Sequence, residues 1–292
     1  MENEKLLLLI DANSFLHRAY HALPPLTAKD GSPAGALYGL SGALLKIIKE
    51  RHPEYLAAAF DRPEPTRRSR EYAAYKATRP KVEEELVNQL IAARGLFQNF
   101  GIAYFEKPGY EADDLIASLV GKFRGSANLK ILVLSSDQDL LQLVEGDRIQ
   151  VEAPVKGISN TVIYDAVKVE EKFSISPQEI PDYKGLVGDQ SDNIPGVPGV
   201  GPKTAAQLIA KYGSVENLIQ QFREIGISES KIAEKLKGNE EQALLSKKLA
   251  KLEEIELDAS LNALSFKLDK KKIAEYLSRL GFASLVSRLG SE

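Results

Sequence analysis

The first half of the chain alternates short apolar runs with longer segments of helical periodicity. The runs are apolar almost throughout, which is typical of strands buried on both faces of a parallel sheet. They are 6–10, 55–60, 102–105 and 130–136. Apolar residues recur every three or four positions over 37–49 and 82–100, which predicts helices between these strands. The pattern predicts an α/β fold with a central, mainly parallel sheet flanked by helices.

The pattern changes in the second half of the chain. Residues 149–164 carry two turn signals, at Lys156-Gly157 and Ser159-Asn160, and we expect a hairpin there. From Asp165 onward the apolar spacing is helical, and the character of the chain changes again near Ser176-Pro177. We therefore predict two domains, an α/β domain over 1–175 and a helical domain over 176–292.

Aspartates follow three of the predicted strands directly. Asp11, Asp61 and Asp137 come at the carboxyl ends of the first, second and last runs. One such aspartate is unremarkable, because aspartate favours loops and helix caps. Parallel strands share their carboxyl edge, where open α/β sheets bind ligands, so three of them are expected to converge there.

Further acids are clustered in two places. Glu111, Asp113 and Asp114 open an apolar-periodic run, where they could cap a helix and offset its dipole. Capping alone does not account for the second cluster, which occupies the loop 188–193. The nine candidate metal ligands are Asp11, Asp61, Glu111, Asp113, Asp114, Asp137, Asp139, Asp189 and Asp192.

Composition restricts the chemistry that these acids can support. The chain has no cysteine and three histidines, which excludes thiolate nucleophiles, disulfides and cysteine-based zinc sites. Many carboxylates without histidine suit hard cations, namely Mg²⁺ or Mn²⁺. One magnesium ion takes one or two protein carboxylates, so nine predict two or more ions. Two ions roughly 3.5–4 Å apart can clamp both oxygens of a phosphodiester displacement.

A basic stretch covers 62–81 of a chain whose formal net charge is −3. Tyrosines are interleaved with its cations, as in surfaces that hold a phosphate backbone and stack exposed bases. The alternative is a solvated charged helix face. We favour DNA binding, with contacts from Arg67, Arg68, Arg70, Tyr72 and Tyr75.

A glycine-rich hairpin follows the second acidic cluster. Exposed backbone N–H groups at Gly196, Gly199 and Gly201 could bind a phosphate without reading sequence, with Lys203 and Thr204 beside them. Pro202 breaks the Gly-Lys-Thr of a nucleotide-hydrolysing phosphate loop, so we reject that motif.

These motifs jointly resemble the 5′ nuclease (flap endonuclease) family, and most closely the 5′–3′ exonuclease domain of bacterial DNA polymerase I. The resemblance covers essentially the whole chain. It rests on Ile10-Asp11, 18–23, 59–61, 75–80, 111–114, 136–139 and 188–193 with the hairpin after them.

The resemblance implies roles for particular residues. Segment 62–100 would form a helical arch, in which Lys76 and Arg79 contact the scissile phosphate, and Arg18 would reach the same region. A helix-hairpin-helix-type clamp over 182–217 would hold duplex DNA. Lys184 and Lys203 would contact phosphates there, and K⁺ could bind its backbone carbonyls. His17 departs from the family, in which many members carry an aromatic residue such as tyrosine.

We therefore expect a metal-dependent 5′–3′ exonuclease and flap endonuclease that acts on 5′ flaps and on nicked or branched duplex DNA in replication and repair. A PIN-type ribonuclease and a non-catalytic DNA-junction binder are the alternatives. We expect a cytoplasmic monomer without a membrane segment. The chain could stand alone or precede a DNA polymerase domain, which would be its partner in the same or another chain.

Overall fold

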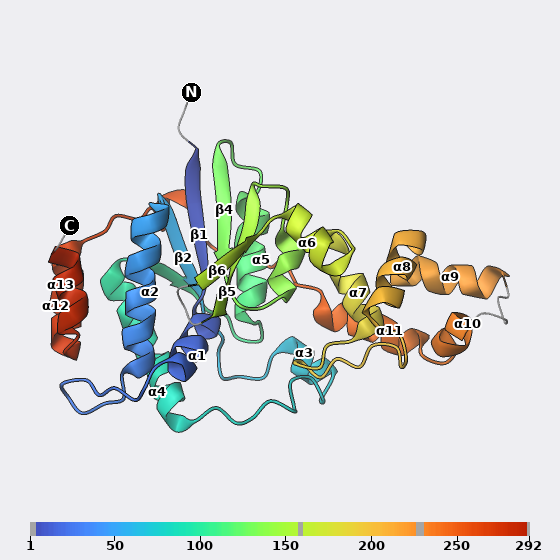
Figure 1. The fold of residues 1–292 in the computed structure, drawn as a ribbon, viewed down its shortest axis with the longest axis horizontal. Helices are drawn as coiled ribbons and strands as arrows, with labels where there is room; N and C mark the ends of the chain where they lie inside the picture. Colours follow the sequence, from blue (N-terminus) through green and yellow to red (C-terminus); the bar gives the residue numbers. More distant parts are fainter. Residues whose placement is uncertain (1–3, 157–159, 226–230, 291–292) are drawn as a thin grey trace.

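A six-stranded sheet forms the centre of the molecule, in the order β3-β2-β1-β4-β5-β6 (Figure 1). The computed structural model describes residues 4–156, 160–225 and 231–290. The strands are β1 (Lys5–Asp11), β2 (Tyr55–Ala59), β3 (Ala103–Phe105), β4 (Leu129–Leu134), β5 (Ile149–Lys156) and β6 (Asn160–Tyr164). Neighbours from β3 to β5 are parallel, and β6 is antiparallel to β5. The predicted sheet and hairpin are confirmed, although Gly157 and Ser159 of the two predicted turns lie outside the described residues.

The apolar runs form strands because both faces of the sheet are covered. In β1, Leu7 and Leu9 point into one core and Leu8 and Ile10 into the other, all at most 1% exposed. One face is covered by α1 (Ala12–Ala22), α2 (Gly35–Arg51) and α4 (Glu84–Phe100). The other face is covered by α5 (Ala112–Phe123). With no solvated face, the central strands need no polar alternation.

Helices from the second half of the chain extend the molecule at one end (Figure 1). They are α6 (Ala166–Phe173), α7 (Ile180–Val187), α8 (Pro202–Tyr212), α9 (Val215–Ile225), α10 (Lys231–Leu236) and α11 (Glu240–Ala250). Three short 3₁₀ turns, η1 (Asp139–Leu143), η2 (Pro177–Glu179) and η3 (Leu261–Leu264), link the larger elements. No described helix is both long and apolar enough to cross a membrane.

The last two helices return to the α/β part. α12 (Lys270–Leu280) and α13 (Ala283–Gly290) pack beside α2 and α4 at the opposite end from α8–α11 (Figure 1). Phe266 donates its N–H to the carbonyl of Glu54 at 2.9 Å, which ties the connecting segment to the sheet. The helices of segment 176–292 are therefore divided between the two ends of the molecule.

The predicted arch is helical mainly in its second part. The helix expected over 82–100 is present as α4 from Glu84. Within the basic stretch 62–81, the backbone is helical only over α3 (Arg67–Glu71). Pro63, Pro65 and Pro80 lie around α3, and proline lacks the N–H that a longer helix would need. The remainder of the stretch is a series of turns that lies near α11 (Figure 1).

Two glycines close the loop that carries the second acidic cluster. Gly188 has φ +78° and Gly196 has φ +63°, and their backbones meet directly. A Cβ on Gly188 would lie 2.5 Å from the carbonyl oxygen of Ile194. Asp189 and Ile194 exchange two backbone hydrogen bonds of 2.8 Å across the same closure. Only glycine fits at this crossing.

We expect Gly188→Ala to lower the free energy of unfolding by about 2 kcal/mol or more, because neither the φ angle nor the contact tolerates a Cβ. Gly201→Ala is the matched control: no atom lies within 4 Å of its Cβ position, and its φ is −95°. Urea unfolding of both variants measures the difference. Equal stability of the two variants would contradict the close packing.

Candidate metal centre and nucleic-acid interface

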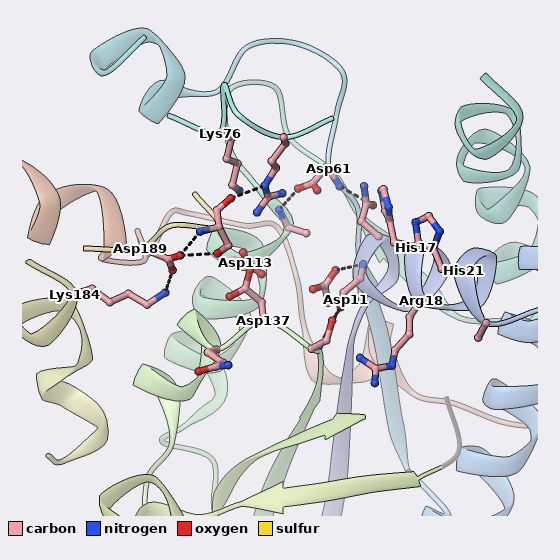
Figure 2. Close-up of a pocket in the computed structure, with 18 residues that line it drawn as sticks. Asp11, His17, Arg18, His21, Asp61, Lys76, Asp113, Asp137, Lys184 and Asp189 are labelled. Carbon is pink, nitrogen blue, oxygen red and sulfur yellow. Dashed lines mark hydrogen bonds and ion pairs between the residues drawn. The ribbon is translucent and has the colours of Figure 1, made fainter. Parts of the chain in front are cut away.

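A cavity of about 810 Å³ opens at the carboxyl edge of the sheet. Five of the nine predicted acids line it, and Figure 2 shows them around one hollow with Lys76 above them and Lys184 beside Asp189. The five are Asp11, Asp61, Asp113, Asp137 and Asp189. The three strand-end aspartates therefore converge, as expected from the shared edge of parallel strands.

Local hydrogen bonds fix the strand-end carboxylates. Asp11 caps α1: its Oδ1 accepts from the N–H of Ser14 at 2.9 Å, and its Oδ2 accepts from the Ser135 hydroxyl at 2.6 Å. Asp61 Oδ1 accepts from the N–H of Ala112, the first residue of α5, at 2.7 Å. Each carboxylate keeps a defined direction toward the cavity because part of it is bound to the backbone.

Burial and neighbouring negative charges disfavour the ionised form of three carboxylates in the cavity. Burial, with the nearby charges of Asp61 and Asp137, raises the pKa of Asp11 to about 7, although its hydrogen bonds oppose the shift. Burial raises the pKa of Asp113 well above its usual value, and the charges of Asp137 and Asp11 add to it. Burial likewise raises the pKa of Asp61. Crowded carboxylates of this kind favour a bound cation, and an all-oxygen donor set fits a hard divalent ion.

Basic side chains already neutralise most of the remaining acids. Lys76 Nζ lies 2.9 Å from Glu111 Oε1, and Arg79 pairs with Asp192. Lys184 lies between Asp139 and Asp189 and pairs with both. Among the described residues, no group of three or more acids or histidines is arranged so that it could hold a metal ion. These ion pairs bring positive charge from the protein itself close to the acids of the cavity.

Lys184 is therefore placed differently from our expectation. We expected a phosphate contact in the duplex clamp, but its ammonium group lies in the acidic cavity. Burial opposes its charge, but Asp139 and Asp189 outweigh that effect and raise the pKa of Lys184. The reason is its position on α7, one turn before the loop that carries Asp189. It serves as a cation of the acidic centre.

Arg68 and Asp114 also differ from their expected roles. Arg68 is 6% exposed and Asp114 is 1% exposed, and two guanidinium nitrogens of Arg68 bind the two oxygens of Asp114 at 2.8 and 2.6 Å. Asp114 is the third residue of α5, and a capping box with Glu111 turns its side chain back toward the helix start. Glu111 and Asp114 thus have the capping geometry, whereas Asp113 faces the cavity. In this conformation Arg68 binds protein acids and does not face solvent for DNA.

The tyrosines and other arginines of the basic stretch divide between the interior and the surface. Tyr75 is 6% exposed and donates its hydroxyl to Glu111 at 3.0 Å, so it is not available to stack on bases as we expected. Tyr72 is half-buried. Arg67 and Arg70 are exposed, as a DNA contact requires.

Helix α1 forms the other wall of the cavity. Arg18 and His17 both line it, and Figure 2 shows Arg18 on the other side of Asp11 from Lys76. Burial, together with the charges of His21 and Arg79, lowers the pKa of His17, which favours its neutral form at neutral pH. A neutral ring can face a phosphate without repelling the metal ions expected beside it.

The glycine hairpin has fewer free backbone groups than its sequence suggests. Gly196 donates its N–H to the Ser246 hydroxyl at 3.0 Å, and its carbonyl accepts from Gln242 at 2.6 Å. The carbonyl of Gly199 accepts from Lys235 at 2.6 Å. Side chains of α11 therefore bind both backbone groups of Gly196, so neither group is free for a phosphate in this conformation.

The start of α8 is the part of the hairpin that faces outward. Gly201 is the N-cap residue of α8, and Pro202 is its first helical residue. Lys203 is exposed and Thr204 is half-buried at the same helix end. A helix N-terminus with a lysine suits a phosphate.

Several polar residues of the site were missed from the sequence. Ser135 binds Asp11, and the side chain of Asn13 accepts from the N–H of Asp61 at 3.1 Å. Their position in the sequence could have identified them, since each stands two residues from a strand-end aspartate. No pattern marks segment 249–255, whose backbone contacts Arg68 and Asp114.

Both parts of the chain match known families. Residues 6–174 match the 5′–3′ exonuclease, N-terminal resolvase-like domain, and residues 175–272 match the 5′–3′ exonuclease, C-terminal SAM fold. The 5′–3′ exonuclease of Aquifex aeolicus is 39% identical over 98% of this chain and 95% of its own. The chain belongs to the 5′–3′ exonuclease family.

Longer relatives and solved structures agree with this assignment. DNA polymerase I of Caldicellulosiruptor bescii is 39% identical over 97% of this chain, which spans about a third of that relative's length. T5 5′-exonuclease with bound zinc has a TM-score of 0.70 at 18% identity, over 98% of this chain and 97% of its own. The catalytic core of Rad2 with DNA substrate has a TM-score of 0.62 at 17% identity, over 98% and 92%. At these identities, the two structures establish the shared fold.

We expect Asp11→Asn to stabilise the metal-free protein more at pH 8 than at pH 5. A raised carboxyl pKa means that the folded state keeps a proton which the unfolded chain has lost, so stability falls as pH rises from about 4 to 7. Asparagine removes that loss, and the gain at pH 8 should be about 1–3 kcal/mol. Thermal unfolding in EDTA measures it, with exposed Asp258→Asn as the control. A gain independent of pH would contradict the raised pKa.

Proposed function

We propose that this chain is a divalent-metal-dependent 5′ nuclease that hydrolyses DNA phosphodiesters at 5′ flaps and at nicks. The observation that carries the proposal is the convergence of five carboxylates in one cavity beneath Lys76 and beside Arg79. Membership of the 5′–3′ exonuclease family supports the same reaction.

The carboxylates that line the cavity would hold Mg²⁺ or Mn²⁺, two or more ions in all. Their oxygen donors, and the raised pKa values of Asp11, Asp61 and Asp113, fit hard cations. T5 5′-exonuclease, which shares the fold, binds divalent zinc, and this is consistent with the proposal. When bound, such ions lower the pKa of water and offset the charge of the leaving oxygen. Glu111 and Asp192, each paired with a basic side chain, lie outside the cavity lining and would support this set indirectly.

The chain's own cations orient the substrate. Burial opposes the charge of Lys76, but Glu111 and Asp192 outweigh it and raise its pKa, so Lys76 stays protonated. Lys76 lines the cavity, and its N–H donates to the carbonyl of Asp192 at 2.9 Å. Lys76 and Arg79 bind the scissile phosphate from this side, and Arg18 binds it from α1.

The outward face of the hairpin holds the duplex. Gly201, Lys203 and Thr204 at the start of α8 contact one phosphate group through the helix end and the lysine charge. T5 flap endonuclease and the catalytic core of Rad2, which share the fold, form complexes with DNA, and this supports a DNA surface on this fold. K⁺ fits less well, because the carbonyls of Gly196 and Gly199 already accept hydrogen bonds from side chains.

The wider assignments stay predictions. We propose a division of the chain near residue 175, which the limits of the two family matches support. A role in DNA replication and repair, a cytoplasmic location, a monomeric state and a polymerase domain as partner, in the same or another chain, belong to the same proposal.

We expect Mg²⁺ or Mn²⁺ to be required for cutting a 5′-labelled flap, and Asp113→Asn to abolish the cut while flap binding persists. Removing one of the crowded carboxylates weakens metal binding but lessens repulsion of the phosphate backbone. Gel analysis gives cleavage, fluorescence anisotropy gives DNA binding, and calorimetry gives Mn²⁺ affinity without reference to activity. Cleavage in EDTA, or full turnover by the variant, would refute the metal role. Binding of the flap without any cut in either metal would favour the non-catalytic alternative.

We expect Lys76→Ala to lower the single-turnover cleavage rate by about 10²-fold or more, because a preorganised cation facing the phosphate is lost. Binding of the flap should change only a few-fold, since phosphate contacts elsewhere persist. Lys81→Ala, an exposed lysine of the same stretch, is the matched control. A loss confined to affinity would exclude the proposed role of Lys76 at the scissile phosphate.

A further inference from the structure

Helix α11 connects the glycine hairpin to the acidic centre. The side chains of Gln242, near its start, and Ser246, in its middle, bind the carbonyl and the N–H of Gly196 at 2.6 and 3.0 Å. Ser246 is fully buried. These two bonds hold the turn that joins the acidic loop to the duplex-facing start of α8.

The other end of α11 holds the base of the arch. The carbonyl of Leu249 accepts from Arg68 Nε at 2.9 Å, and the carbonyl of Lys251 accepts from Arg68 Nη2 at 2.9 Å. The N–H of Glu253 donates to Asp114 Oδ1 at 2.9 Å, so the same segment also holds the acid that binds Arg68. Arg68 lies eight residues before Lys76, in the stretch that places Lys76 over the cavity.

The segment after α11 contacts two further acid-bearing elements. Gln142, at η1, donates to the carbonyl of Ala250 at 3.1 Å and accepts from the N–H of Leu252 at 3.0 Å. The N–H of Ile255 donates to the Ser118 hydroxyl on α5 at 2.8 Å. We call residues 249–255 the strap. The strap binds the arch, α5 and η1 at once.

A helix is stiff, and α11 is about 16 Å long at 1.5 Å per residue. It is bound to the hairpin through Gln242 near its start and Ser246 in its middle, and to the arch through the carbonyl of Leu249 near its end, about 10 Å along the axis from Gln242. A stiff helix that is bound to the hairpin at one point and to the arch at another sets the distance between them. Here it joins the duplex contact at α8 to the cations over the cavity.

We propose that α11 and the strap set the distance between the duplex contact and the catalytic cavity, and thereby select which phosphodiester is cut relative to the end of the duplex. The inference rests on the proposed nuclease function. Gln242 and Ser246 are positioning residues in it, because they act through Gly196 and do not touch the substrate. The consequence is a defect in the position of the cut, which a purely structural role would not produce.

The test compares product lengths from a 5′-labelled flap on a nicked duplex, resolved at single-nucleotide resolution. The variants are Gln242→Ala and Ser246→Ala, and exposed Glu241→Ala on the same helix is the matched control. We expect wild type and the control to give one main product. Both hairpin-end variants should move cuts to neighbouring phosphodiesters and reduce the share of the main product by about twofold or more, because small misplacements redirect attack.

A second substrate isolates the duplex contact. On a wholly single-stranded 5′-labelled oligonucleotide, the variants should give the same product pattern as wild type, because no duplex is present to set the position.

Thermal unfolding reports any loss of stability, and the variant at half-buried Gln242 allows the test even if Ser246→Ala does not fold. Variants that cut the flap at the wild-type position, merely more slowly, would overturn the inference. If wild type cuts neither substrate, the nuclease function itself is refuted.

Discussion

The repulsion among carboxylates at one edge of the sheet governs the rest of this structure. Parallel strands bring Asp11, Asp61 and Asp137 together, and α5 adds Asp113 at the same edge. Buried like charges are unfavourable unless positive charge accompanies them. The protein supplies that charge from Lys76 on the arch and Lys184 on α7. The arch and the helical end are therefore bound to the sheet electrostatically as well as by packing.

Much of this arrangement could be predicted from the sequence, because it follows from local pattern and shared topology. The strands could be recognised because helices cover both faces of the sheet, which makes the strands apolar almost throughout. Aspartates at the ends of parallel strands come together because the strands share their carboxyl edge. Which acids would face the cavity could not be predicted. Asp113 and Asp114 are adjacent and chemically identical, and only the capping geometry of α5 directs one to the cavity and the other to Arg68.

Three residues that we expected to contact DNA are bound within the protein for the same physical reason. Arg68, Tyr75 and Gly196 carry groups that suit DNA, but each is bound by a partner distant in sequence. Charge and residue type predict what a side chain can bind, whereas its exposure depends on tertiary packing. The basic stretch is rich in cations partly because the protein needs some of them internally. A cluster of arginines and tyrosines therefore overstates the area that DNA can contact.

Because the ion pair between Arg68 and Asp114 is buried, it responds to ionic strength differently from the contacts that exposed lysines make with DNA. Mobile ions screen exposed charges over about 10 Å at 0.1 M salt but hardly reach a pair that is almost wholly excluded from solvent. Contacts between exposed lysines and phosphates weaken steeply as salt rises. A rise in salt can therefore release the nucleic acid while the arch stays docked on α5 and the strap. The protein can dissociate from one DNA and meet the next with its acidic centre already assembled.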